Sequence, residues 1–231
     1  MKKKVVSIAL TGLLSATTAQ AGNLRLALGA KAGTLGAGIE AFVPVSQRFN
    51  TRISLNQFDY SYNQTIDDID YTGNLNLNSV TINGDWHPFN GVFRLTAGAV
   101  INNNELTGTA TPSQNIQFTI GDNDYSSQNI RANAQITFNK VAPYLGFGFD
   151  KVSKFRRGGL GISAEFGVVF QGTPKANLEV VDLNKGLPGE IQGPLLDQLN
   201  ADIQKEVDAM SSDLEAFNIW PVASLGLTYQ F

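Results

Sequence analysis

The last twelve residues constrain the fold of this chain more than any other stretch. From Trp220 onward, large apolar residues alternate with small or polar ones, and the sequence ends on an aromatic residue. The large residues that share one face of this extended segment are Leu225, Leu227, Tyr229 and Phe231. A strand whose apolar face meets lipid has a reason to place an aromatic ring at the membrane boundary. The stretch therefore predicts the membrane-facing strand that closes an outer-membrane barrel.

The first 21 residues have the layout of a secretory signal peptide. A run of lysines follows the first residue, an apolar stretch extends from Val5 to Leu14, and Ala19-Gln20-Ala21 matches the small-x-small cleavage pattern. We therefore expect residues 1–21 to be removed on export and residues 22–231 to form the mature barrel. The chain has no cysteine, which excludes disulfides and a lipid-attached cysteine.

Membrane integration of the mature chain would have to use strands. Outside the leader, the sequence contains no run of about 18 apolar residues, the length that a spanning helix needs. In lipid, the only other structure that satisfies every backbone polar group is a closed barrel. Charged residues make up 16% of the chain, compared with about 25% in soluble proteins. These observations predict a location in the outer membrane of a Gram-negative cell envelope.

Seven earlier segments show the same alternation and, with the last one, predict eight strands. They lie at residues 24–31, 35–43, 52–62, 71–86, 93–102, 141–149 and 160–171. An even number of strands places both termini on the periplasmic side, with short turns there and longer loops outside. We therefore expect an all-β, antiparallel, up-and-down transmembrane β-barrel of about eight strands. A change of phase near Leu75 and Leu77 predicts a bulge, and Asp67–Asp70 is predicted to be a polar loop.

Two long connections have features of their own. Residues 103–139 contain short alternating pieces that predict strand extensions above the membrane. In the last extracellular loop, apolar residues recur at helix spacing, and Pro194 stands where a first helical turn tolerates it. Residues 193–216 are therefore predicted to contain an amphipathic helix that packs on the barrel rim or on neighbouring loop strands. A membrane-surface or partner-binding helix is the alternative, but the acidic polar face lacks attraction to anionic headgroups.

Several motifs in the second half of the chain carry a family resemblance. They are Val141-Ala142-Pro143-Tyr144-Leu145-Gly146-Phe147-Gly148-Phe149, Glu165-Phe166-Gly167, Gly172-Thr173-Pro174-Lys175, the acidic helical segment, Trp220-Pro221-Val222 and Leu225-Gly226. With these motifs, residues 141–231 resemble the CarO-like family of outer-membrane proteins. The resemblance implies a small monomeric barrel of eight strands, associated with the uptake of small amino acids and with carbapenem susceptibility. It transfers no substrate, because no binding residue of the family can be placed on a matching motif.

Seven charged residues fall on the predicted inner face of the barrel. They are Arg25, Lys31, Glu40, Arg52, Asp85, Arg94 and Glu165. Both signs are present, and side chains just about fill the interior of an eight-stranded barrel. A paired structural core is therefore favoured over an open aqueous path. The functional alternative is a narrow or gated, porin-like passage in which these charges select a small zwitterionic solute.

The sequence provides no support for an enzyme, a metal centre or a bound cofactor. The only histidine, His87, lies in a predicted periplasmic turn, so a nucleophile or a metal ion lacks a histidine partner. The acidic groups at Asp67–Asp70 and at Asp122 and Asp124 lack the spacing of an ion-binding loop and are interpreted as solvated loops. The formal net charge of −3 provides no basic excess for nucleic acid.

The expected partners follow from this architecture. They are the lipid and lipopolysaccharide of the outer membrane, and the outer-membrane assembly machinery, which would engage the C-terminal strand; the barrel itself is expected to be a monomer. Two functions remain open: a narrow uptake channel for small solutes such as amino acids, and a non-conducting structural or surface-recognition barrel that acts through extracellular loops. A soluble periplasmic ligand-binding barrel is the alternative fold, but the polar inner face favours the membrane arrangement.

Overall fold

The computed structural model describes residues 26–66, 68–112, 117–120, 123–126, 130–150, 159–182 and 194–231. Within these ranges, eight antiparallel strands close into a barrel, because β5 pairs with β10 on one side and with β4 on the other. The barrel strands are β1 (Ala27–Gly33), β2 (Gly36–Pro44), β3 (Phe49–Ile66), β4 (Ile69–Trp86), β5 (Phe93–Asn102), β10 (Val141–Asp150), β11 (Gly159–Phe170) and β13 (Ile219–Gln230). The all-β barrel expected from the alternation is confirmed. The predicted signal peptide and Arg25 lie outside the described residues.

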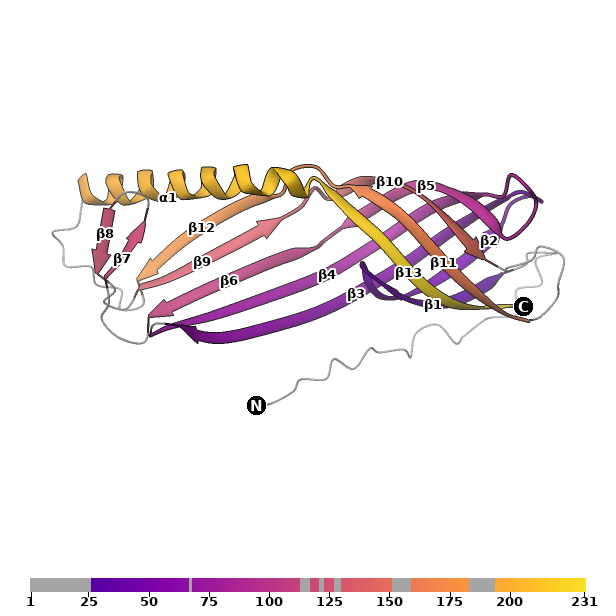
Figure 1. The fold of residues 1–231 in the computed structure, drawn as a ribbon, viewed down its shortest axis with the longest axis horizontal. Coiled ribbons are helices and arrows are strands. Elements are labelled where there is room, and N and C mark those ends of the chain that lie inside the picture. Colours follow the sequence, from indigo (N-terminus) through magenta and orange to yellow (C-terminus); the bar gives the residue numbers. More distant parts are fainter. Residues whose placement is uncertain are drawn as a thin grey trace.

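A second sheet continues from one side of the barrel wall. The lower part of β4, Ser79–Trp86, pairs with β5, whereas its upper part, Ile69–Asn76, pairs with β6 (Glu105–Pro112). β9 (Ile130–Thr137) pairs with β6, and β12 (Lys175–Asp182) pairs with β9. The upper part of β3, residues 58–66, pairs with the upper part of β4. We call the sheet formed by upper β3, upper β4, β6, β9 and β12 the extension sheet. A separate hairpin joins β7 (Gln117–Ile120) and β8 (Asn123–Ser126). Figure 1 shows an elongated molecule with the barrel at one end and the extension sheet at the other.

The connection between β11 and β13 contains the predicted helix. α1 (Pro194–Asp213) is followed by a short 3-10 helix, η2 (Leu214–Phe217). α1 lies along β12, the edge strand of the extension sheet, and reaches the β7–β8 hairpin (Figure 1). The half-buried side chains of α1 include Ile203, Val207 and Met210, which recur at helix spacing. The helix therefore lies against a neighbouring loop strand with these apolar side chains half-buried.

Neither helix of the described ranges combines the length and the apolar character that crossing a bilayer requires.

The side chains of β3 reverse their pattern where the barrel gives way to the extension sheet. In the barrel, the inward row is polar and the outward row is apolar: Ser54 is fully buried, whereas Ile53 is 47% exposed. Above Gln57, the inward row becomes aromatic and the outward row becomes polar. The aromatic row is Phe58, Tyr60 and Tyr62, and the polar row is Asp59, Ser61, Asn63 and Thr65. The strand thus keeps its alternation but exchanges the chemistry of its two faces.

This reversal corrects the prediction of a bulge near Leu75 and Leu77. β3 and β4 pair in one continuous register over all 18 residues of each strand. In that register, Leu75 lies opposite Tyr60 and Leu77 opposite Phe58, so all four side chains extend the inward row. The phase of the alternation changes because the surroundings of the strand change, while the backbone pairing stays regular.

The turn at the tip of this hairpin is also tighter than predicted. β4 begins at Ile69, inside the segment Asp67–Asp70 that was expected to be a polar loop. Asp68 has a φ of 61°, the left-handed conformation that Asp tolerates in tight hairpin turns. The hairpin therefore stays regular almost to its tip.

Candidate functional site

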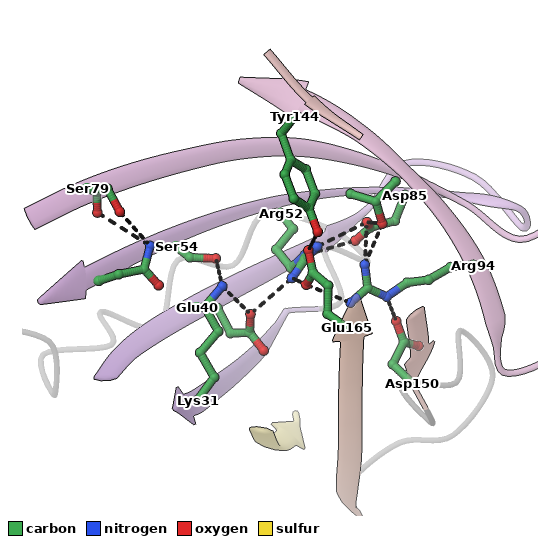
Figure 2. Close-up of polar contacts among 12 residues, drawn as sticks. Lys31, Glu40, Arg52, Ser54, Ser79, Asp85, Arg94, Tyr144, Asp150 and Glu165 are labelled. Carbon is green, nitrogen blue, oxygen red and sulfur yellow. Dashed lines mark hydrogen bonds and ion pairs between the residues drawn. The ribbon is translucent and has the colours of Figure 1, made fainter. Parts of the chain in front are cut away.

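Buried charged side chains form a connected network inside the barrel. We call it the lumen network, and it comprises Lys31, Glu40, Arg52, Asp85, Arg94, Tyr144, Asp150 and Glu165 (Figure 2). Its ionic side chains come from seven different strands and are at most 7% exposed. The network brings together six of the seven charges selected from the sequence; the seventh, Arg25, lies outside the described residues. Strand alternation places them all on one face, and barrel closure brings that face together.

Arg52 on β3 is the centre of one half of the network. Its Nε lies 3.1 Å from Oδ2 of Asp85, and its Nη1 lies 3.3 Å from Oε2 of Glu40. The same Nη1 also pairs with Oε2 of Glu165, which reaches it from the opposite side of the barrel. The guanidinium carbon lies 5.7 Å from the centroid of the Phe42 ring, within the range of a cation–π contact. One arginine thus links β2, β4 and β11.

Arg94 on β5 is the centre of the other half. Its Nη1 lies 2.8 Å from Oδ1 of Asp85, its Nη2 lies 3.0 Å from Oε2 of Glu165, and its Nε lies 2.9 Å from Oδ2 of Asp150. The Thr96 hydroxyl donates to Oδ1 of Asp85 at 2.7 Å. Asp85 and Glu165 therefore each sit between two arginines, so the positive and negative groups alternate in space. This alternation is what makes the burial of so many charges tolerable.

Lys31 and Tyr144 attach to opposite sides of this arrangement. Lys31 Nζ lies 3.6 Å from Oε2 of Glu40 and donates to the Ser54 hydroxyl at 3.2 Å. The Tyr144 hydroxyl donates to Oε1 of Glu165 at 2.5 Å. Figure 2 shows Tyr144 reaching the network from the side opposite Lys31. Tyrosine and lysine thus complete the hydrogen bonding of carboxylates that the arginines already neutralise.

The sequence analysis missed two members of the network, Tyr144 and Asp150. Both lie on β10, in the same inward row as Gly146 and Gly148. Asp150 lies one residue beyond the predicted segment 141–149, although it is an even-numbered position like Tyr144 and therefore falls on the same inner face. The alternation of β10, continued by one position, would have identified Asp150. Nothing in the sequence indicated that Tyr144 would bind a carboxylate rather than pack among apolar residues.

Small residues make room for these large side chains. A β-carbon at Gly146 or at Gly167 would clash with the Tyr144 hydroxyl, and one at Gly148 would lie 3.0 Å from the guanidinium carbon of Arg94. The inward glycines of β10 and β11 therefore fit the shapes of Tyr144 and Arg94. This complementarity, together with the near-zero exposure of the charges, means that side chains fill the lumen at this level.

A second, apolar layer lies in the barrel interior toward the extension sheet. The layer comprises Leu35, Val100, Ala142, Tyr144, Val169 and Val222, with Trp220 packed against it. Tyr144 belongs to both layers, because its ring packs among the apolar residues while its hydroxyl reaches Glu165. Along β5, Val100 follows Arg94 in the direction of the extension sheet. At this level the described interior thus holds an apolar cluster, with buried polar residues such as Asn56 and Ser79 on β3 and β4 facing it.

The outer surface of the barrel has the opposite chemistry. The residues selected from the closing strand, Leu225, Leu227, Tyr229 and Phe231, are 66%, 61%, 45% and 61% exposed. On the neighbouring strands, exposed aromatic rings pack on one another: the ring centroids of Phe147 and Phe166 are 5.8 Å apart. A surface this apolar, wrapped around a polar interior, reverses the arrangement of a water-soluble barrel.

The described residues contain no group of three or more His, Cys, Asp or Glu side chains that could hold a metal ion. In the lumen network, the carboxylates that would be the ligands are paired with Arg52, Arg94 or Lys31. His87 lies buried in the turn after β4, with Nδ1 3.1 Å from the carbonyl oxygen of Gly91 and Nε2 3.3 Å from Nδ2 of Asn50. These contacts hold the turn together. Asp67 and Asp122, which belong to the acidic groups interpreted as solvated loops, lie outside the described residues.

Comparisons with known proteins bear on this fold. No protein-family model matches the chain, and no curated protein matches it. Among solved structures, the crystal structure of CarO from Acinetobacter baumannii matches with a TM-score of 0.54 and 21% identity, covering 89% of this chain and 97% of that one. CarO2 from the same organism matches with the same TM-score and identity, covering 90% of this chain and 99% of that one. The chain therefore has a CarO-like fold, as the resemblance of its sequence motifs implied.

Proposed function

We propose that this protein is a non-conducting integral barrel of the outer membrane that displays the extension sheet outside the cell as a recognition surface. The observation that carries the proposal is the contrast between the two parts of the molecule: the barrel lumen is filled by the lumen network and the apolar layer, whereas the extension sheet exposes a broad face. A filled barrel is an anchor, and a surface held rigidly above an anchor is suited to binding.

The exposed apolar wall supports the membrane location. Its outward residues meet the requirement of a lipid-facing band, and closure between β1 and β13 leaves no open strand edge in the barrel. This closure also supports a monomer in contact with lipid and lipopolysaccharide. The outward row of β13 is the surface that the assembly machinery would engage. The predicted signal peptide supplies the export step.

The packing of the lumen argues against conduction. A solute could pass only by separating Arg52 and Arg94 from their carboxylates inside the barrel. Separating a buried ion pair by removing one partner costs about 3–5 kcal/mol, and here several pairs share the same groups. The apolar layer would then have to open as well. Closed packing is therefore the stable state of this interior.

Planar-bilayer recording of the purified, folded protein tests this proposal. We expect no reproducible conductance steps, while a general porin reconstituted in parallel conducts. Heat-modifiable migration on a gel, measured on the same sample, shows that the barrel is folded and closed. Reproducible steps from the folded sample would contradict a non-conducting function.

A narrow uptake channel for small zwitterionic solutes is the second candidate. The observation in its favour is that both signs of charge lie together across one lumen, from Lys31 to Asp150, as the recognition of an amino acid would require. A liposome-swelling assay over a panel of small amino acids, combined with uptake by a deletion strain, separates the two candidates. Selective swelling with reduced uptake in the deletion strain would favour the channel.

A further inference from the structure

The extension sheet has two edges that differ in how they are protected. At the β12 edge, α1 lies along the strand (Figure 1). At the other edge, β2 leaves β3 after the pair Ala37–Gln57, and from Phe58 to Ile66 the strand β3 pairs with β4 alone within the described chain. Every residue from Gln57 to Ile66 is exposed. One edge is therefore covered and the other is open.

Backbone hydrogen bonding shows which residues face the open edge. The Phe49 carbonyl accepts from the amides of Val45 and Ser46 on the β2 side, at 2.9 and 3.0 Å, whereas the Arg48 carbonyl accepts from the His87 amide on the β4 side, at 2.8 Å. Along an antiparallel strand these directions alternate from one residue to the next. The odd-numbered residues therefore point their amides and carbonyls away from β4. In the open segment they are Asp59, Ser61, Asn63 and Thr65.

Apart from the single charge of Asp59, this edge lacks the features that normally prevent strand addition. Exposed edges are commonly blunted by Lys, by Pro, by bulges or by a covering element. Between Phe58 and Ile66 there is no Lys, Arg, Pro or Gly, and the register with β4 is unbroken. An open and regular edge of this length is a ready template for another extended chain.

The two faces beside the edge define the chemistry of a ligand. Phe58, Tyr60 and Tyr62 are 45%, 55% and 51% exposed and form an apolar row. Side chains on one face of a strand repeat about every 6.6–6.8 Å, so an added strand would place every second side chain against this row. The only charged residues in the described part of the hairpin above Gln57 are acidic, namely Asp59, Asp68 and Asp70. An extended peptide with alternating apolar and polar residues, including basic ones, fits both faces.

We propose that the open edge of β3, from Phe58 to Ile66, binds an extended peptide segment of a partner protein by β-strand addition. Apolar side chains of the peptide pack on the aromatic row, and its backbone pairs with the outward amides and carbonyls of the odd-numbered residues. The inference rests on the proposed recognition function, for which it names the binding edge and the class of ligand.

A second copy of the chain in the same membrane fits this edge less well than a free peptide. Copies related by an axis along the membrane normal run their β3 strands in the same upward sense. Their edges could pair only as parallel strands, which form the less stable ladder, whereas a free peptide can pair antiparallel. The partner is therefore a different chain, or a segment free to take the opposite direction.

Peptide binding to the full-length protein in detergent tests the proposal. The probe is a labelled nine-residue peptide that alternates valine with threonine and lysine, followed by fluorescence anisotropy and by backbone amide exchange of the protein. We expect saturable binding and slower exchange at the Ser61 and Asn63 amides. A proline in the centre of the probe should weaken binding about tenfold, because it removes a ladder donor.

A matched pair of protein variants controls for side-chain loss. N63P removes an outward amide without touching the ladder to β4, whereas N63T alters the side chain but keeps the amide. We expect about tenfold weaker binding for N63P and less than about twofold for N63T. Heat-modifiable migration shows whether each barrel has folded. Y60S, which shortens the aromatic row but keeps the edge, should also weaken binding.

Several results would overturn the proposal. No amide protection at about millimolar peptide would do so, and so would equal binding by N63P and N63T. Binding of purified lipopolysaccharide oligosaccharide in place of the peptide would assign the aromatic row to glycans instead. A conducting wild-type protein that still binds the probe at this edge would contradict the non-conducting barrel while leaving the binding edge intact.

Discussion

The lower and upper halves of the β3–β4 hairpin have the same pairing and opposite chemistry. In the barrel half, buried polar groups such as Ser54 face inward and residues such as Ile53 face outward; in the extension half, Tyr60 faces inward and Asp59 outward. Because the register is continuous, backbone geometry cannot explain the difference. Under the proposed membrane location, the medium on each side of the sheet explains it, and the change of phase after Gln57 marks the level at which lipid gives way to water.

The two halves also differ in how they satisfy their inward groups. The barrel encloses its inward charges and pairs them with one another, so its stability depends on these buried ion pairs staying intact. The extension sheet leaves much of its inward aromatic row exposed and relies on the pairing of its strands. Substitutions in the barrel should therefore be costly, and comparable substitutions in the extension should be mild.

Removing Arg94 should have the largest effect. R94L leaves Asp85, Asp150 and Glu165 without one of their cationic partners inside the barrel. We expect a loss of about 3–5 kcal/mol in the free energy of unfolding, because unpaired buried charge remains. Urea titration in detergent, followed by heat-modifiable migration, measures the loss.

The exposed Arg48, in the turn between β2 and β3, provides the control for this substitution. R48L should change the free energy of unfolding by less than about 0.5 kcal/mol. Equal unfolding midpoints for R94L and the wild type would show that the lumen network contributes nothing to stability, and the contrast between barrel and extension would fail.

Introducing a charge on the outward row of β4 tests the boundary between the two media. Ile82 and Asn76 share this row, but Ile82 lies in the barrel half and Asn76 in the extension half. I82K should destabilise the folded protein in a bilayer by about 2–4 kcal/mol, because its charge meets lipid. N76K should change stability by less than about 0.5 kcal/mol, since its charge meets water beside Asp59.

Urea unfolding of both variants in liposomes measures this difference. Similar effects from the two lysines would place both positions in the same medium. The change of phase would then lose its meaning as a membrane boundary.

Strand alternation explains why so much of the barrel was predictable from the sequence. In a barrel wall, successive residues of a strand face alternately outward and inward, so the position along the strand is enough to place Arg52 and Glu165 in the lumen. The alternation cannot show which charges meet, because Arg52 and Glu165 are 113 positions apart in the sequence and come into contact only when the barrel closes. The pairing partners therefore required the structure.

The extension sheet was harder to predict for a physical reason. Sequence reading took outward residues to be apolar, which holds only where the surroundings are lipid. β12 shows the reversed pattern, with Ala176 and Leu178 on the face of the aromatic row and Lys175 and Asn177 on the other, and it was not recognised as a strand. Because of the same assumption, the change of phase at Leu75 was interpreted as a bulge. Searching for alternation of either phase would have found both features.

The smallest of these effects comes from removing single tyrosine hydroxyls in the two regions. The Tyr144 hydroxyl donates a hydrogen bond to the buried Glu165. The Tyr62 hydroxyl, on the exposed aromatic row, donates one to the side chain of Gln64. Y144F should lower the free energy of unfolding by about 1.5–3 kcal/mol, because it removes a hydrogen bond to a buried carboxylate. Y62F should change it by less than about 0.5 kcal/mol, because water replaces the lost partner. The two variants lose the same atom, so urea titration isolates the effect of the surroundings; equal losses would mean that the Tyr144 hydroxyl is as well hydrated as that of Tyr62, which a filled lumen does not permit.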